Sequence, residues 1–152
     1  MTALLPELAG LPVEGVFDGE LVPFADGEPH FPLVCERLLH GARAVSLTFV
    51  IFDVLEIDHE STLAWPYSRR RAALEELTLG EGPWLVPDVY DDGAALFAAV
   101  CEHRFEGVVA KRRGERYRPG ERCWIKIKNR DYWRYGEELE SLRKSLERRR
   151  RL

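Results

Sequence analysis

The sequence predicts an α+β domain whose strands pair mainly in antiparallel fashion. Strand-like and helix-like segments both occur, and they follow one another without the regular alternation that produces a parallel sheet. The length of 152 residues fits one compact domain with a substantial hydrophobic core. We therefore expect one domain over residues 1–135 and a charged C-terminal helix over residues 136–152.

The first third of the chain is expected to contain two strands and a short helix. Residues 16–24 alternate partly between apolar and polar side chains, as a strand does, and Asp26-Gly27 marks a turn after them. Pro32 suits the first turn of a short helix. The apolar residues of this helix are Leu33, Val34, Leu38 and Leu39. Residues 45–55 are nearly all apolar and rich in Val, Ile, Phe and Thr, which predicts a buried central strand.

The middle of the chain predicts a helix followed by an edge strand. Residues 58–66 are polar and read as a loop, and Ser68 is a plausible N-cap for a helix that ends at Leu79. Its packing residues are expected to be Ala72, Leu74, Leu77 and Leu79. Pro87 interrupts the strand-like residues 84–90, and a proline inside a strand favours a place at the edge of the sheet.

The last third combines a capped helix, two strands and a basic loop. Asp91 or Asp92 can cap a helix that ends at Cys101. Short strands are expected at residues 107–110 and 124–127, with a basic loop between them. Residues 137–151 predict a charged helix with one apolar side. That side consists of Leu139, Leu142 and Leu146.

Charge is distributed unevenly along the chain. Residues 1–100 hold 17 acidic and 5 basic residues, whereas residues 101–152 hold 9 acidic and 17 basic ones. The net charges of −12 and +8 make the C-terminal third suitable for a polyanion such as nucleic acid or nucleotide phosphate. For the run of arginines at residues 148–151 alone, a solvated helix end is the favoured explanation.

The cysteine count and the apolar pattern predict a cytoplasmic protein. The three cysteines are odd in number and match no zinc-binding spacing, so unpaired thiols in a reducing compartment are expected. No apolar run reaches the roughly 18 residues that a membrane span needs. The first ten residues lack the basic start and long apolar stretch of a signal peptide.

Four short segments combine charged residues with a strand-like context. They are Phe17-Asp18-Gly19-Glu20-Leu21-Val22, residues 49–55, residues 106–112 and Trp124-Ile125-Lys126-Ile127-Lys128-Asn129. In the last, alternation places Lys126 and Lys128 on one face of the strand, while Ile125 and Ile127 are expected to pack on the other. A phosphate would offset the repulsion between the two lysines. Each segment alone has an ordinary structural explanation, and their order along the chain is the stronger signal.

The ordered set resembles the covalent nucleotidyltransferases, and most closely the ATP-dependent DNA ligases of bacteria. The four segments are similar to motifs III, IIIa, IV and V of that family, and the likeness extends over residues 13–135. Tyr117-Arg118-Pro119-Gly120 and residues 129–133 add to it. The resemblance implies a partial ligase adenylation domain, over residues 1–135, that carries motifs III to V.

The resemblance also implies a role for individual residues. Glu20 matches the motif III glutamate on the ribose and metal side, Phe52 the aromatic that stacks on adenine, and Glu106 the motif IV glutamate that supports a divalent metal. Lys126 and Lys128 match the motif V lysines that contact the α-phosphate, and Lys111 is a further phosphate candidate. The implied cofactors are ATP, bound as AMP after reaction, and Mg²⁺, held by Glu106 and Glu20. The implied substrate is nicked duplex DNA.

The family nucleophile, the lysine of a Lys-x-Asp-Gly motif, is not found in these 152 residues. The lysines are Lys111, Lys126, Lys128 and Lys144, and none lies two residues before an Asp-Gly pair. Neither motif V lysine is expected to substitute. We therefore expect no covalent AMP transfer by this chain alone, weak binding of adenine nucleotide, and binding of duplex DNA through the basic third.

Three hypotheses stay open at this point. The chain is one half of a ligase that acts with an N-terminal piece supplying the nucleophile, or a non-catalytic nucleic-acid-binding remnant, or a superfamily relative such as an RNA ligase or capping guanylyltransferase. A domain cut before motif III is expected to expose a strand edge and to self-associate or be unstable. Arg118, Arg122 and Arg130 are candidate contacts to DNA phosphates.

Overall fold

The computed structural model describes residues 8, 10–25, 27–30, 33–34, 37, 44–121, 123–133 and 135–136. The chain divides into two compact units. The first unit is drawn from residues 1–88 and 113–121, and the second unit from residues 89–112 and 122–152. The assignment of residues 1–135 to one domain stays a prediction, and the helix predicted over residues 137–151 lies outside the described residues.

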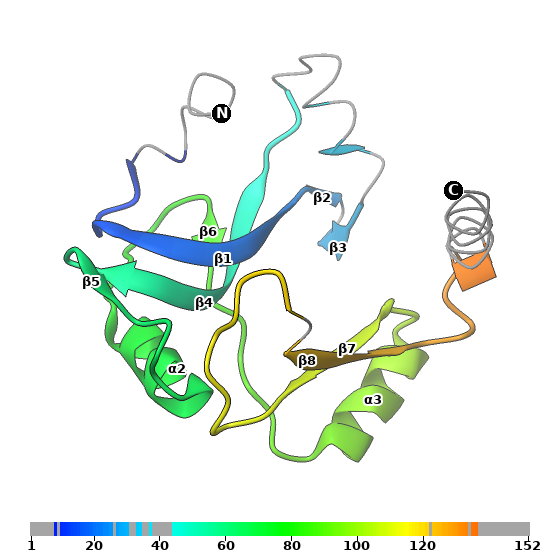
Figure 1. The fold of residues 1–152 in the computed structure, drawn as a ribbon. Coiled ribbons are helices and arrows are strands. Elements are labelled where there is room, and N and C mark those ends of the chain that lie inside the picture. The colour runs from blue at the N-terminus through cyan, green and yellow to red at the C-terminus, as the bar shows by residue number, and fades with distance from the viewer. Residues whose placement is uncertain are drawn as a thin grey trace, which may run out of the picture. The chain divides into compact units, whose positions relative to one another are not determined.

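A four-stranded sheet is the framework of the first unit (Figure 1). Its strands are β1 (Gly15–Val22), β4 (Thr48–Ile57), β5 (Glu60–Ser61) and β6 (Trp84–Leu85). The central strand β4 pairs antiparallel with β1 and β5 and parallel with β6. The predicted α+β class with mainly antiparallel pairing is confirmed, and so are the central strand and the edge position of the strand near Pro87. That edge strand is two residues long, because the extended chain leaves the sheet before Pro87.

A short hairpin follows β1. Its strands β2 (Phe24–Ala25) and β3 (Glu28–Pro29) pair antiparallel, and Gly27 occupies the turn with a φ of 84°. This positive φ favours glycine and explains the turn signal in the sequence. Of the short helix predicted from Pro32, Leu33 and Val34 are described and have helical backbone, whereas Pro32, Leu38 and Leu39 lie outside the described residues.

The core of the first unit lies where β4 meets helix α2 (Tyr67–Glu76). Ile51 and Val54 of β4 pack with Leu74 of the helix and with Leu79, which follows it. The helix ends three residues earlier than predicted, because Leu77 already has extended backbone and serves as the C-cap. Leu74, Leu77 and Leu79 contact the core as expected, but Ala72 is exposed, so its predicted packing role is wrong.

The start of α2 differs from the prediction for a physical reason. Pro66, not Ser68, is the N-cap, and no side chain caps the helix. The N–H groups of Tyr67 and Ser68 donate instead to the carbonyls of Glu115 and Arg113, at 2.8 and 2.9 Å. These carbonyls satisfy donors that a helix start leaves without partners. Carbonyls of a loop more than forty residues downstream therefore take the capping role that was predicted for the Ser68 side chain.

The second unit contains helix α3 (Gly93–Glu102) and a hairpin of β7 (Gly107–Lys111) and β8 (Trp124–Lys128). Asp92 caps α3 as predicted: its carboxylate accepts from the N–H groups of Ala94 and Ala95 at 3.1 and 2.9 Å. Val100 is the buried residue of α3. None of the helices in the described part of the chain has the length and apolar character needed to span a membrane.

The apolar side of β8 is exposed, contrary to prediction. Ile125 is 59% and Ile127 43% exposed, so neither packs in the way that the alternation suggested. The reason lies in the arrangement of the unit, because α3 packs mainly against β7. Within the described part of this unit, the packing of α3 against β7 leaves these two isoleucine side chains uncovered.

Candidate nucleotide-binding site

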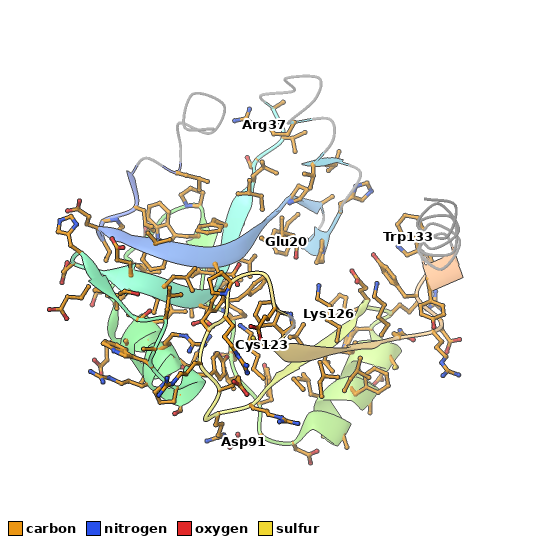
Figure 2. All side chains as sticks on the ribbon, in the orientation of Figure 1. Glu20, Arg37, Asp91, Cys123, Lys126 and Trp133 are labelled. Atoms are coloured by element: carbon orange, nitrogen blue, oxygen red, sulfur yellow. The ribbon has the colours of Figure 1, made fainter. Side chains whose placement is uncertain are left out.

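Glu20 and Phe52, the two candidate residues of the first unit, lie on neighbouring strands. Glu20 is exposed on β1 (Figure 2) and pairs with Val50 of β4, two residues before Phe52. The register skips Phe52, because Asp18 pairs with Asp53 and Gly19 with Ile51. A bulge of this kind changes the direction of a side chain and is common beside functional sites. The predicted adenine platform therefore lies at one of the two irregular positions of the central strand, and Leu55 lies at the other.

Gly19, between the two carboxylates of the Asp-Gly-Glu segment, is required by close packing. A Cβ atom at this position would overlap the carbonyl oxygen of Val50 and the ring of Phe49. Any larger residue would push β1 away from β4. The local motif thus has a structural reason that is independent of any ligand.

Asp18 is held by a tyrosine that lies 99 residues away in sequence. The hydroxyl of Tyr117 donates to the Asp18 carboxylate at 3.0 Å. Burial, together with the hydrogen bond and the negative charge of Asp18, raises the pKa of Tyr117 from 10.0 to about 12. Asp18 therefore serves the packing of the first unit, and Glu20 is the more accessible carboxylate of the pair.

This tyrosine predicts a pH dependence of stability. Because the pKa of Tyr117 is raised in the folded state, its contribution is present in full below about pH 10 and is lost as the pH rises towards about 12. We expect urea unfolding to show a steep loss of stability over this range. Tyr117→Phe should be less stable at neutral pH but should lose stability less steeply. Replacing the exposed Tyr90 with phenylalanine is the control, and an equal slope in Tyr117→Phe and wild type would contradict the prediction.

The four candidate residues of the second unit gather on one hairpin. The Lys128 ammonium lies 3.1 Å from the Glu106 carboxylate, and Lys111 lies over the Trp124 ring at 5.3 Å from its centroid. Lys126, labelled in Figure 2, is exposed and pairs with Val109. The register places Lys111 opposite Trp124 and Lys128 opposite Gly107, so alternation puts all three lysines on one face of the hairpin.

This hairpin face can bind phosphate. Three ammonium groups share one face, and that of Lys128 lies beside the Glu106 carboxylate. The close approach of the strands at Glu106 depends on Gly107, which has a φ of 154° and leaves no room for a Cβ atom beside the Ile127 backbone. An arriving phosphate would share Lys128 with Glu106 and would meet Lys126 directly.

The donor set fits a magnesium–nucleotide complex better than an isolated magnesium ion. Among the described residues, no three His, Cys, Asp or Glu side chains come together as a metal-binding group. Magnesium is commonly held by one or two carboxylates and completed by substrate phosphates and water. Glu106, beside Lys128, can supply one such oxygen ligand. Glu20 belongs to the other unit, so its predicted share in the same metal stays a prediction.

The structure describes the surroundings of two of the three arginines predicted to contact DNA. Arg118 is already engaged by two carboxylates, those of Glu115 and Glu121. Arg130 is exposed, and Arg122 lies outside the described residues. Their role in binding DNA stays a prediction, and a phosphate at Arg118 would have to compete with these two carboxylates.

The most deeply buried charges among the described residues were not singled out as a pair from the sequence. Asp53 is 1% and Arg70 3% exposed, and two hydrogen bonds of 2.8 and 2.9 Å join them in bidentate geometry. The available signal was a carboxylate inside the apolar strand at residues 49–55, because a buried charge needs a partner. Three consecutive arginines, at residues 69–71, made the choice of partner ambiguous.

Residues 9–128 match the ATP dependent DNA ligase domain family. The chain belongs to this family. The match covers every candidate residue from Glu20 to Lys128, including the bulge at Phe52 and the lysine hairpin. It therefore confirms the predicted resemblance to ATP-dependent DNA ligases and the mixed helix and antiparallel sheet fold.

Curated relatives of this ligase-family chain are longer proteins. It is 38% identical over 135 residues to the multifunctional non-homologous end joining DNA repair protein LigD of Mycobacterium tuberculosis, covering 85% of this chain and 17% of LigD. It is 31% identical over 138 residues to the SPbeta prophage-derived DNA ligase-like protein LigB of Bacillus subtilis, covering 87% of this chain and 51% of LigB. The chain thus spans about a sixth of LigD and half of LigB.

Solved structures agree with these relatives. The crystal structure of the ligase domain from M. tuberculosis LigD matches with a TM-score of 0.65 and 37% identity, over 83% of this chain and 40% of that one. A mycobacterial DNA ligase D complexed with ATP and MES matches with a TM-score of 0.66 and 37% identity, over 84% and 41% of the two chains. The likeness thus holds in sequence and in three dimensions.

Proposed function

We propose that this chain is the part of an ATP-dependent ligase adenylation domain that carries motifs III to V, and that it acts in sealing nicks in duplex DNA. The observation that carries the proposal is the lysine hairpin, with Glu106 beside Lys128, inside a family match over residues 9–128. ATP is the expected nucleotide, because the family is ATP dependent and one similar structure was determined with ATP.

Each candidate residue has a proposed role in binding the nucleotide. Phe52 stacks on adenine, Glu20 accepts from the ribose, and Lys126 and Lys128 neutralise the α-phosphate. Lys111 is a further phosphate contact, and Glu106, together with Glu20, supports Mg²⁺. The shared requirement is that charge be neutralised while the phosphorus is held for in-line attack. An aromatic platform and a face with three cations suit these tasks.

The proposed reaction proceeds in three transfers. A lysine nitrogen attacks the α-phosphorus of ATP, a P–N bond forms, pyrophosphate leaves and the nitrogen loses a proton. The 5′-phosphate at the nick then displaces the lysine and takes AMP. Finally the 3′-hydroxyl attacks that 5′-phosphorus, AMP leaves and the strand is joined. We propose that residues outside these 152 supply the attacking lysine, since no Lys-x-Asp-Gly motif occurs among them.

The proposed partners follow from charge and exposure. The net charge of +8 over residues 101–152 suits nicked duplex DNA, with Arg118, Arg122 and Arg130 as candidate phosphate contacts. A polypeptide with the nucleophile motif is the second partner, or else the chain self-associates. The exposed Ile125 and Ile127 support one of these protein contacts. We propose a cytoplasmic location.

The proposal is tested by incubating the chain with α-labelled ATP and Mg²⁺, followed by denaturing electrophoresis. We expect no label on this chain alone, because the nucleophile is supplied elsewhere. When a second polypeptide carrying the Lys-x-Asp-Gly part of a relative is added, label should appear on that polypeptide and should require this chain. A label that survives denaturation on this chain alone would contradict the proposed division of roles.

Binding measurements separate the ligase proposal from its alternative. Calorimetry of the chain with Mg²⁺ and ATP should detect binding, and a fluorescent nicked duplex should bind with a strong dependence on salt. A non-catalytic nucleic-acid-binding protein would bind the duplex equally well with and without nucleotide and would not bind ATP. That result would overturn the proposed function.

A further inference from the structure

We infer that Arg70 is a positioning residue for the nucleotide site, because its guanidinium holds the strand of Phe52 and the loop of residues 113–121 in a single arrangement. This inference rests on the proposed function, since it concerns how the first unit presents Phe52 and Glu20. Arg70 lies on α2, and its hydrogen bonds go to Asp53 and to backbone carbonyls rather than to Phe52 or Glu20. Its effect on the nucleotide must therefore pass through the residues that it binds.

The guanidinium of Arg70 contacts three separate segments of the chain. Nε and Nη2 donate to the two carboxylate oxygens of Asp53 on β4, at 2.8 and 2.9 Å. Nη1 donates to the carbonyl of Trp65, in the turn before α2, at 2.6 Å. The same nitrogen donates to the carbonyl of Glu115 at 3.3 Å. One planar group therefore joins a strand, a turn and a loop, and its contact in the loop lies 45 residues from Arg70 in sequence.

The loop held by Arg70 is also bound to the first unit by its backbone. Its carbonyls at Arg113 and Glu115 accept from the start of α2, and the N–H of Tyr117 donates to the carbonyl of Leu63 at 3.1 Å. The Tyr117 hydroxyl then reaches Asp18, two residues before Glu20. The network that begins at Arg70 thus ends beside Phe52 on β4 and close to Glu20 on β1.

The position demands arginine rather than any cation. A lysine has a single nitrogen and cannot bond both oxygens of Asp53 while also reaching two carbonyls on the far side. The side chain is 3% exposed, so water cannot replace the lost donors. Arg71, the next residue, offers a matched comparison: it donates to Glu75 and to the carbonyl of Pro87, both at 2.6 Å, and contacts neither Asp53 nor the loop in the described bonds.

The experiment compares Arg70→Lys with Arg71→Lys and with Leu74→Ala, a core variant of the same helix. Hydrogen exchange is measured at the amides of Tyr67, Ser68 and Tyr117, and ATP and adenosine affinities are measured by calorimetry where all variants are folded. We expect exchange at these amides to be about tenfold faster in Arg70→Lys alone. Both affinities should fall about tenfold in that variant, because Phe52 contacts the base that the two ligands share.

The outcomes distinguish a positioning role from a merely structural one. Faster exchange with unchanged affinity would overturn the inference, as would equal losses of affinity in Leu74→Ala. Unchanged exchange would show that the loop does not depend on Arg70. If Arg70→Lys does not fold, Tyr117→Phe cuts the same network at its far end and should show the same two effects. A wild-type chain that binds no ATP would overturn the proposed function, and the exchange data would still report on the loop.

Discussion

Replacing Asp53 with alanine is expected to lower the free energy of unfolding by about 3–5 kcal/mol. The change leaves the Arg70 guanidinium buried without its carboxylate, since Arg70 is 3% exposed and both oxygens of Asp53 bind it. An unpaired buried charge costs far more than the net value of the pair itself. Urea unfolding followed by circular dichroism provides the measurement.

A double variant tests the cause of this loss. Asp53→Ala combined with Arg70→Met removes both charges, so it should be more stable than Asp53→Ala alone. The two remaining acceptors, the carbonyls of Trp65 and Glu115, lose a donor in the double variant, and recovery should therefore be incomplete. If the double variant is less stable than the single one, the unpaired charge is not the cause.

Replacing Lys128 with methionine is expected to weaken ATP binding by about 10-fold to 100-fold, the value of one hydrogen bond to a charged group. The aliphatic stem is kept, and the fold should change little because the Lys128–Glu106 pair is partly exposed. Adenosine affinity should be unchanged, because adenosine has no phosphate. Calorimetry with both ligands separates a phosphate contact from a general loss of the site.

Two further variants complete the comparison. Lys144→Met removes a lysine that lies outside the four motifs and should bind ATP as the wild type does. Phe52→Ala should weaken ATP and adenosine by the same factor, because both ligands carry the base. Equal losses of ATP and adenosine affinity in Lys128→Met would contradict the proposed α-phosphate contact.

Local patterns were sufficient to predict several elements of the fold. Asp92 caps α3 because an aspartate before a helix satisfies its first N–H groups, and that is visible in sequence. Ser68 fits the same rule but does not cap α2, because the carbonyls of Glu115 and Arg113, from a distant loop, accept from the first N–H groups of the helix. A rule based on neighbours cannot anticipate a partner supplied by tertiary structure.

The site shows the same division between local and distant information. Alternation was sufficient to place Lys126 and Lys128 on one face of a strand, and the register agrees. The expectation that Ile125 and Ile127 pack on the other face was wrong, because the burial of a side chain depends on which elements cover that face of the strand. The bulge at Phe52 and the bond from Tyr117 to Asp18 depend on strand register and loop path, which no short segment encodes.

The loop of residues 113–121 has a consequence for synthesis on the ribosome. The first unit needs this loop for the Asp18 and Arg70 contacts, yet the loop is made after residues 89–112 of the second unit. At about 5–20 residues per second, the nascent chain waits about 2–7 s between residue 88 and the arrival of residue 121. During that interval Arg70 lacks its Glu115 acceptor, and the first turn of α2 lacks the carbonyls of Arg113 and Glu115, so this is the period in which a chaperone or protease would find the emerging polypeptide most accessible.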